Sequence, residues 1–293
     1  MKTSIKLAAL GAVALAATST AALAGTTNSI LPAGITTGVP LGAALPEGVY
    51  DISVASYGSQ NQALGNVAYA IPVWLIWSTP WQIAGGHIMF DTATGVADVW
   101  NPAGGNLPIP GAGTSADSFL NTLVDAGIAW NLGGGWNVGL HAGAWLPSTQ
   151  TLPMILGRDY TAFQGIAAVS YVANGWDLSA TGIWAEGGDG SANRTQDPYF
   201  NLDLTASRKY GKLELGTIAY GSWQTGCAGG GSCAKADQFA IGGLVGYDFG
   251  SFIAKVKLAE DVSTSRAYGE KETRGSLMII KPLWNPAAEG PLK

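Results

Sequence analysis

Few side chains in this sequence are suited to acid–base or nucleophilic catalysis. The 293 residues include only 2 histidines, at His87 and His141. His141 is followed by Ala142, Gly143 and Ala144, so the serine that a membrane-embedded phospholipase carries two residues after its histidine is missing. We therefore predict that the protein is not an enzyme, and that it has neither a cofactor nor a metal site.

The 2 cysteines, Cys227 and Cys233, lie in the sequence CAGGGSC. Glycine and serine between them predict a surface loop. In an exported protein such a pair is expected to form a small disulfide that closes the loop. A metal site is the alternative, but no histidine or carboxylate lies between the cysteines to complete one.

Polar residues that could select solutes alternate with apolar residues along several segments, as expected for the wall of a water-filled interior. In one interpretation they pair across neighbouring strands; in the other they form a charged constriction. We predict that Asp203 and Glu214 oppose each other near one turn. Lys255 and Lys257, on one strand, would neutralise the two carboxylates only if closure of the barrel brings them near. The predicted lumen-lining residues are Trp74, Asp125, Asn137, His141, Asp177, Asn201, Asp203, Glu214, Lys255 and Lys257.

β-Hairpins that follow one sequence pattern must position these residues. The segment Asp159–Ala185 shows this pattern most clearly. On both sides of Asn174-Gly175, apolar residues alternate with small or polar ones. A period of two predicts strands whose two faces meet different environments, and Asn-Gly supplies the positive φ that tight turns need. Asp117–Pro147 and Gln238–Ala259 follow the same pattern.

The whole pattern predicts an all-β fold, a closed antiparallel transmembrane β-barrel of about 12 strands with short periplasmic turns and long external loops. Charged residues make up 12% of the chain, against about 25% in typical soluble proteins. Aromatic residues gather beside the short turns, as in the belt of a membrane protein. They are Trp77, Trp81, Trp130, Trp136, Tyr171, Trp176, Tyr210, Tyr247, Phe252 and Trp284.

The chain divides into four parts. Residues 1–24 have a basic start, a short apolar core and Ala22-Leu23-Ala24, which predicts a cleaved secretory signal peptide. Residues 25–45 are rich in Gly, Pro and Thr and predict a loose N-terminal lead-in; whether it enters the lumen is open. Residues 46–284 form the barrel and 285–293 a C-terminal tail. The net charge is −5 without a basic run, so nucleic acid is not an expected partner.

The second predicted strand, Val67–Ser78, alternates throughout. Val67, Tyr69, Ile71, Val73, Leu75 and Trp77 are predicted to share one face. Trp74 and Ile76 lie on the other face, which gives the lumen an apolar side if that face points inward. The facing of the third and last strands is not assigned, because residues such as Met89 and Phe90 compete.

Several segments resemble the MetA-pathway of phenol degradation family, outer-membrane transporters found near genes for the catabolism of hydrophobic compounds. They are Leu45–Tyr50, Trp74–Thr79, Ile83–Phe90, Ala144–Ser148, Ala168–Tyr171 and Gly175–Leu178. The resemblance covers most of residues 45–284 and implies a channel, without site residues to transfer. Family members tend to end on an aromatic residue, whereas this chain continues past Trp284.

These observations predict a bacterial outer-membrane channel for the passive uptake of small hydrophobic or aromatic compounds, linked to their catabolism. Its expected partners are membrane lipid, the solutes and the barrel-assembly machinery. Solutes would pass along the apolar side near Trp74 and Ile76. A structural or adhesive barrel with a blocked lumen is the alternative, and a membrane-embedded lipid-modifying enzyme is less favoured.

Overall fold

The computed structural model describes residues 30–60, 66–101, 104–106, 113–147, 161–187, 197–227, 235–265 and 271–286. The predicted signal peptide and residues 287–293 lie outside these ranges. No helix in the described part of the chain is long and apolar enough to cross a membrane. The strands are β1 (Gly48–Gln60), β2 (Asn66–Ile83), β3 (Gly86–Trp100), β4 (Ser115–Phe119), β5 (Thr122–Gly133), β6 (Trp136–Leu146), β7 (Ala162–Ala173), β8 (Trp176–Gly187), β9 (Tyr199–Tyr210), β10 (Leu213–Gln224), β11 (Asp237–Asp248), β12 (Ile253–Thr264) and β13 (Glu272–Trp284).

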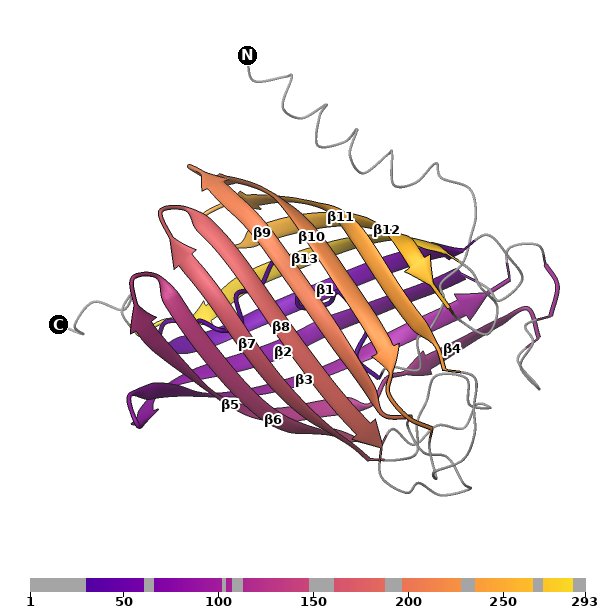
Figure 1. Ribbon diagram of the computed structural model, residues 1–293, viewed down its shortest axis with the longest axis horizontal. Coiled ribbons are helices and arrows are strands. Elements are labelled where there is room, and N and C mark those ends of the chain that lie inside the picture. Colours follow the sequence, from indigo (N-terminus) through magenta and orange to yellow (C-terminus); the bar gives the residue numbers. More distant parts are fainter. Residues whose placement is uncertain are drawn as a thin grey trace, which may run out of the picture.

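The strands close into a barrel, because β1 pairs antiparallel with both β2 and β13 (Figure 1). Every other neighbouring pair is antiparallel as well. One edge of β3 is shared: residues from His87 to Ala93 pair with β5, and residues from Val96 to Trp100 pair with β4. The 13 strands of the described residues therefore occupy twelve positions. This confirms the predicted closed barrel of about 12 strands.

Tight turns join the strands at one end of the barrel, and longer connections join them at the other (Figure 1). Between β7 and β8, Asn174 has φ 53° and Gly175 has φ 81°. Both values are positive, as a type I′ hairpin turn requires. Outer-membrane barrels place their short turns in the periplasm, which gives this end its expected side.

The turn between β2 and β3 uses alanine where glycine or asparagine is preferred. Ala84 has φ 50° and Gly85 has φ 77°. Because the left-handed conformation costs an L-residue roughly 1–2 kcal/mol, we expect Ala84→Gly to raise the free energy of unfolding. The gain should be about 0.5–1 kcal/mol, since glycine also loses more freedom on folding. Urea titration in lipid vesicles would measure it.

Ala173→Gly is the matched control for this prediction. Ala173 ends β7 beside a similar turn and does not have a positive φ. Glycine there should lower stability slightly. An equal gain at both positions would contradict the explanation from backbone strain.

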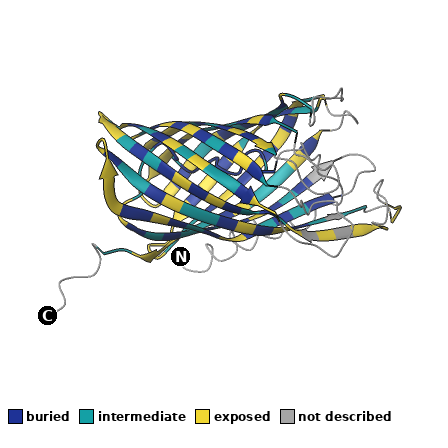
Figure 2. Ribbon diagram, turned by 90° about the horizontal axis from the view of Figure 1, so that it is seen from below, coloured by how far each residue is buried: buried dark blue, intermediate teal, exposed yellow. Residues whose placement is uncertain are grey.

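Buried and exposed residues alternate along the strands, which gives the barrel a chequered surface (Figure 2). The exposed face is strongly apolar, whereas many inward residues are polar. This is the arrangement of a barrel with lipid outside. Large exposed residues of the barrel exterior include Val124, Leu140, Phe163, Val169, Leu178, Leu215, Ile241, Val245, Val256, Leu258 and Leu277.

Exposed aromatic residues lie beside the short turns, as predicted. Trp77 and Trp81 have ring centroids 5.2 Å apart, and the rings of Trp136 and Tyr171 are separated by the same distance. Trp284, at the end of β13, is 40% exposed. Aromatic side chains at this level suit the boundary between lipid and water.

The predicted alternation of β2 is wrong in its first half. Val67, Tyr69 and Ile71 are buried, whereas Val73 and Trp77 are exposed. The register of β2 shifts between Ala70 and Val73 against β3, and β1–β2 pairing shifts at the same level. Such an irregularity reverses the facing of the residues that follow it, here as far as Ser78, where the register shifts again.

Three further assignments complete the inner surface. In β1 the apolar face points inward, with Tyr50 and Ile52 at most 7% exposed. In β3 Met89 is buried and Phe90 is 40% exposed, which decides the facing that the sequence left open. In β13 Met278 is fully buried. The wall around β1 therefore presents apolar side chains to the lumen.

Candidate functional site

The segment Ile30–Leu45, which we call the plug, lies inside the barrel (Figure 1). Its backbone forms successive turns, for example through the hydrogen bond from Val39 N to Thr36 O at 3.0 Å. Ile35 is only 1% exposed. Residues 25–45 were predicted to be a loose lead-in, but from Ile30 onward the chain is buried and held by hydrogen bonds to the wall.

One carboxylate of the wall binds the first turn of the plug. Asp203, on β9, is 2% exposed. Its Oδ1 accepts a hydrogen bond from the Gly34 backbone N–H at 2.8 Å. Its Oδ2 accepts two more, from the backbone N–H of Thr36 at 3.0 Å and from its hydroxyl at 2.6 Å. A buried carboxylate must have donors, and here the plug supplies them.

Two lysines of β12 bind plug carbonyl groups. Lys257 Nζ donates to Gly34 O at 3.0 Å, to Thr37 O at 3.1 Å and to the Thr37 hydroxyl at 3.0 Å. Lys255 Nζ donates to another plug carbonyl at 2.7 Å and forms a salt bridge with Glu214 at 2.9 Å. One side of the lumen wall thus binds the plug through a carboxylate, that of Asp203, and two ammonium groups, those of Lys255 and Lys257.

The predicted opposition of Asp203 and Glu214 is wrong. The β9–β10 register pairs Asp203 with Tyr220 and Glu214 with Lys209. Asp203 lies deep in the barrel, whereas Glu214 lies next to the turn. The closed wall does bring Lys255 to Glu214, as the prediction required.

The plug runs from the long-loop end of the barrel to the short-turn end. Near the start of β9, Asn201 Nδ2 donates to Leu31 O at 3.0 Å. Further along the same strand, the Thr205 hydroxyl accepts from a plug N–H at 2.8 Å. Beside the opposite end, the Ser78 hydroxyl donates to Leu45 O at 2.7 Å. The wall therefore offers partners to the backbone polar groups of the plug along its length.

Two glycines allow the plug to approach the wall closely. Gly34 has φ 81° and Gly38 has φ 82°. A Cβ on Gly34 would lie 2.5 Å from the ring of Tyr220, and one on Gly38 would lie 2.6 Å from Leu244. Both positions require glycine for conformation and for space.

The apolar side chains of the plug pack mainly against the wall formed by β1 to β5. One cluster joins Leu31, Ile35, Val39 and Leu41 of the plug to Ile52, Val54, Tyr69, Ile71, Trp74, Ile76, Ala93 and Leu123 of the wall. The lumen thus has a polar side that binds the plug backbone and an apolar side that packs its side chains.

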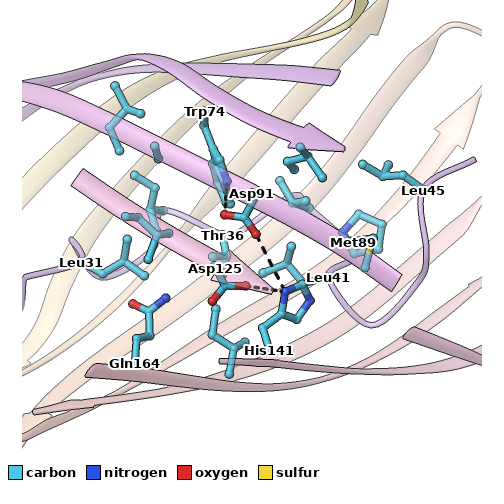
Figure 3. Close-up of a pocket in the computed structure, with 18 of the residues that line it drawn as sticks. Leu31, Thr36, Leu41, Leu45, Trp74, Met89, Asp91, Asp125, His141 and Gln164 are labelled. Atoms are coloured by element: carbon cyan, nitrogen blue, oxygen red, sulfur yellow. Dashed lines mark hydrogen bonds and ion pairs between the residues drawn. The ribbon is translucent and has the colours of Figure 1, made fainter. Parts of the chain in front are cut away.

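A cavity remains between the plug and the apolar wall (Figure 3). It has a volume of about 60 Å³, and its surface consists almost entirely of apolar atoms. Leu41 lines it from the plug, and Trp74, Met89 and Ile166 line it from the wall. A space of this size holds a few water molecules or part of a small solute.

The amide nitrogen of Gln164, in the cavity wall, lacks a partner among the described residues. Trp145 Nε1 donates to Gln164 Oε1 at 3.0 Å, which fixes the orientation of the amide. Gln164 Nε2 is buried and makes no hydrogen bond within this part of the chain. Since an unpaired buried donor is costly, this amide is suited to bind an oxygen atom of a molecule in the cavity.

Three titratable side chains lie together in the same wall (Figure 3). His141 Nδ1, on β6, is 3.0 Å from Asp125 Oδ1 on β5 and 4.0 Å from Asp91 Oδ2 on β3. Trp74 Nε1, from β2, donates to Asp91 Oδ1 at 3.0 Å. Four neighbouring strands therefore contribute one side chain each to this level of the lumen.

The remaining predicted residues, Asn137 and Asp177, bind residues two positions away in the sequence. Asn137 Nδ2 donates to Gly135 O at 3.0 Å, close to a turn. Asp177 accepts a hydrogen bond from the hydroxyl of Ser179. Both are 8% exposed. Solute selection by any of the ten predicted lumen residues stays a prediction.

The predicted disulfide also stays a prediction, since Cys233 lies outside the described residues.

Sequence reasoning missed two parts of the site, the plug and Asp91. The spacing of Gly34, Gly38 and Gly42 was the available signal for the plug, because a Cβ at any of these positions would lie within 3.0 Å of a wall atom. Asp91 was missed because the facing of β3 could not be assigned.

Residues 50–271 match the family described as MetA-pathway of phenol degradation. The chain belongs to this family. The match covers most of the chain and agrees with the resemblance seen in its short segments. The family's description names a pathway, and no transported solute follows from it. No curated protein matches the sequence.

The chain is similar to several solved structures, of which the first named here shows the same fold. The COG4313 outer membrane channel from Pseudomonas putida F1 matches with a TM-score of 0.63 at 14% identity, over 81% of this chain and 96% of its own. A FadL homologue from Pseudomonas aeruginosa has a TM-score of 0.48 at 9% identity, over 86% and 99%. The translocator domain of autotransporter NalP from Neisseria meningitidis has 0.46 at 12%, over 80% and 88%.

Proposed function

We propose that the protein is an outer-membrane channel for the passive uptake of small hydrophobic or aromatic compounds, and that the plug closes it in the state described. Family membership and the barrel fold support a channel-like outer-membrane protein. The apolar cavity beside the plug is the observation that supports the solute class. A hydrophilic solute would lose hydrogen bonds there, whereas apolar surface gains from burial.

The plug can leave without breaking the barrel. Within the described residues it is continuous with the wall only through Leu45–Gly48, and it pairs with no strand. A solute would enter at the long-loop end, occupy the cavity beside Trp74 and Ile76, and continue down its gradient when the plug moves. Gln164 Nε2 would bind an oxygen of a hydroxylated or carboxylated aromatic compound.

Vesicle transport measurements test this proposal. After the rate in protein-free liposomes is subtracted, purified protein should admit an aromatic anion such as benzoate faster than glucose, and a variant lacking residues 30–44 should admit both faster. A blocked structural barrel predicts no uptake of either solute by either protein, which would overturn the proposal. Release of fatty acid from the vesicles would instead indicate a lipid-modifying enzyme.

Filling the cavity should slow uptake of the aromatic solute. Ala93, on β3, lines the cavity and is 5% exposed. Ala93→Leu adds three carbon atoms to this space, and we expect about a tenfold lower rate of benzoate uptake above that of protein-free liposomes, the effect of small misfits in apolar pockets. The rate of tracer entry into proteoliposomes measures it.

Ala126→Leu is the matched control for this change. Ala126 lies on the neighbouring strand β5 and faces outward, where added carbon meets lipid. Its uptake rate should equal that of the wild type. An equal loss in both variants would mean that the cavity is not on the path of the solute.

A further inference from the structure

The cluster of Asp91, Asp125 and His141 carries more negative charge than its neighbours offset. Asp91 and Asp125 are directly opposite on β3 and β5. Like charges at such positions repel each other, and both side chains are at most 7% exposed. The charged groups that act most strongly on Asp91 and His141 belong to the cluster itself, and the ion pairs seen for the two carboxylates in the described residues are with His141.

Two polar atoms of the cluster have no hydrogen-bond partner in the described part of the chain, although both are buried. They are Asp125 Oδ2 and His141 Nε2. The side chains concerned are 1% and 6% exposed. The Leu41 backbone of the plug is a polar neighbour of the imidazole, whereas Asp125 Oδ2 has no hydrogen-bond partner among the described residues. An unpaired oxygen on a buried carboxylate requires an explanation, such as an ion bound by that carboxylate.

Glycines make room for both side chains. Gly127, which pairs with His141, would place a Cβ 2.2 Å from Nδ1. Gly143, which pairs with Asp125, would place a Cβ 2.6 Å from Oδ2. Any larger residue would displace the imidazole or the carboxylate, so the wall is shaped around these two groups.

The distances suit coordination of one ion. The three potential ligand atoms all lie within 4.8 Å of one another, and His141 Nδ1 is 3.0 and 4.0 Å from the two carboxylates. Neighbouring ligands of tetrahedral Zn²⁺ are about 3.3–3.5 Å apart, given metal–ligand bonds of about 2.0–2.2 Å. Small side-chain movements would therefore bring the three atoms into place.

We propose that Asp91, Asp125 and His141 bind a divalent transition-metal ion, for which Zn²⁺ is the best match, in the lumen wall beside the plug. One imidazole and two carboxylates combine the ligand types of zinc sites. Trp74 orients Asp91 through its indole N–H, as second ligand layers do in metal sites. The open coordination position faces the cavity, where water or a solute oxygen would complete it.

Metal titration of the full-length protein, refolded into detergent after chelator treatment, tests this proposal. We expect one equivalent of Zn²⁺ by elemental analysis after desalting, and Co²⁺ at the same site should give the visible absorption of a tetrahedral complex. His141→Gln should weaken Zn²⁺ binding at least about 100-fold, and Asp91→Asn should weaken it as well. His87→Gln is the control, because this second histidine lies near a turn, beside Gln82.

Retained Zn²⁺ affinity in both Asp91→Asn and His141→Gln, or loss of it only in His87→Gln, would overturn the proposal. So would a wild-type protein that binds no Zn²⁺ and gives no Co²⁺ spectrum. The spectrum on wild-type protein decides the matter even if a variant fails to fold. Neither result depends on solute uptake, so the metal site and the channel function stand or fall separately.

Discussion

Replacing Asp203 with alanine is expected to open the channel. The carboxylate accepts three hydrogen bonds from Gly34 and Thr36 of the plug, two of them from backbone N–H groups. Each buried donor left unpaired costs about 1–3 kcal/mol, and Lys257 would lose a nearby opposite charge. The plugged state should lose several kcal/mol relative to an open state, and each 1.4 kcal/mol changes the ratio about tenfold.

Single-channel recording in planar bilayers would measure the result. Wild-type protein should be closed most of the time, whereas Asp203→Ala should conduct at least about tenfold more often. Asp177→Ala is the control, because this buried aspartate bonds to Ser179 and not to the plug. The shift in gel mobility on heating would show that each variant has folded.

If Asp203→Ala stays as closed as wild type while a variant lacking residues 30–44 conducts, the carboxylate does not hold the plug. If neither variant conducts, the plug is not what closes the lumen. Equal opening in Asp177→Ala would point to a general loosening of the wall.

Leu140→Arg is expected to destabilise the barrel in lipid by about 2–4 kcal/mol, the cost of arginine at the bilayer midplane. Leu140 lies near the middle of β6 and is 50% exposed. Its neighbours on the adjacent strands are Ile128 and Ala167, so the surrounding surface is apolar. Equilibrium unfolding by denaturant in lipid vesicles would give the difference.

Leu132→Arg is the control for this change. Leu132 is 64% exposed and lies at the end of β5 beside a short turn, where arginine reaches the interface. The expected cost there is about 0–1 kcal/mol. If Leu140→Arg changed stability by less than about 0.5 kcal/mol, as surface substitutions in water do, the outer face would not be in lipid.

Most of the barrel could be predicted because alternation reports directly on two different environments. Asn174-Gly175 marks a turn, and the residues on both sides alternate as the structure requires. Prediction failed at Ile71, because a bulge reverses the facing without changing the composition. Only the pairing of strands reveals it.

The site was less predictable, because its parts come from segments far apart in sequence. Asp125 and His141 were both predicted to line the lumen, but their contact with Asp91 depends on the register of three strands. The plug has the composition of a loop and has no regular strand pairing. Its burial follows from polar groups on β9 and β12 that no local pattern in residues 25–45 reveals.

The course of the plug limits what the channel could admit. Between Leu31 near the start of β9 and Leu45 beside Ser78, a stretch of polypeptide with its side chains occupies the lumen along its length. Withdrawal of that stretch would vacate a passage about as wide as one peptide chain with its side chains, on the order of 10 Å. Single aromatic rings pass such an aperture, whereas folded proteins and branched oligosaccharides are sieved out.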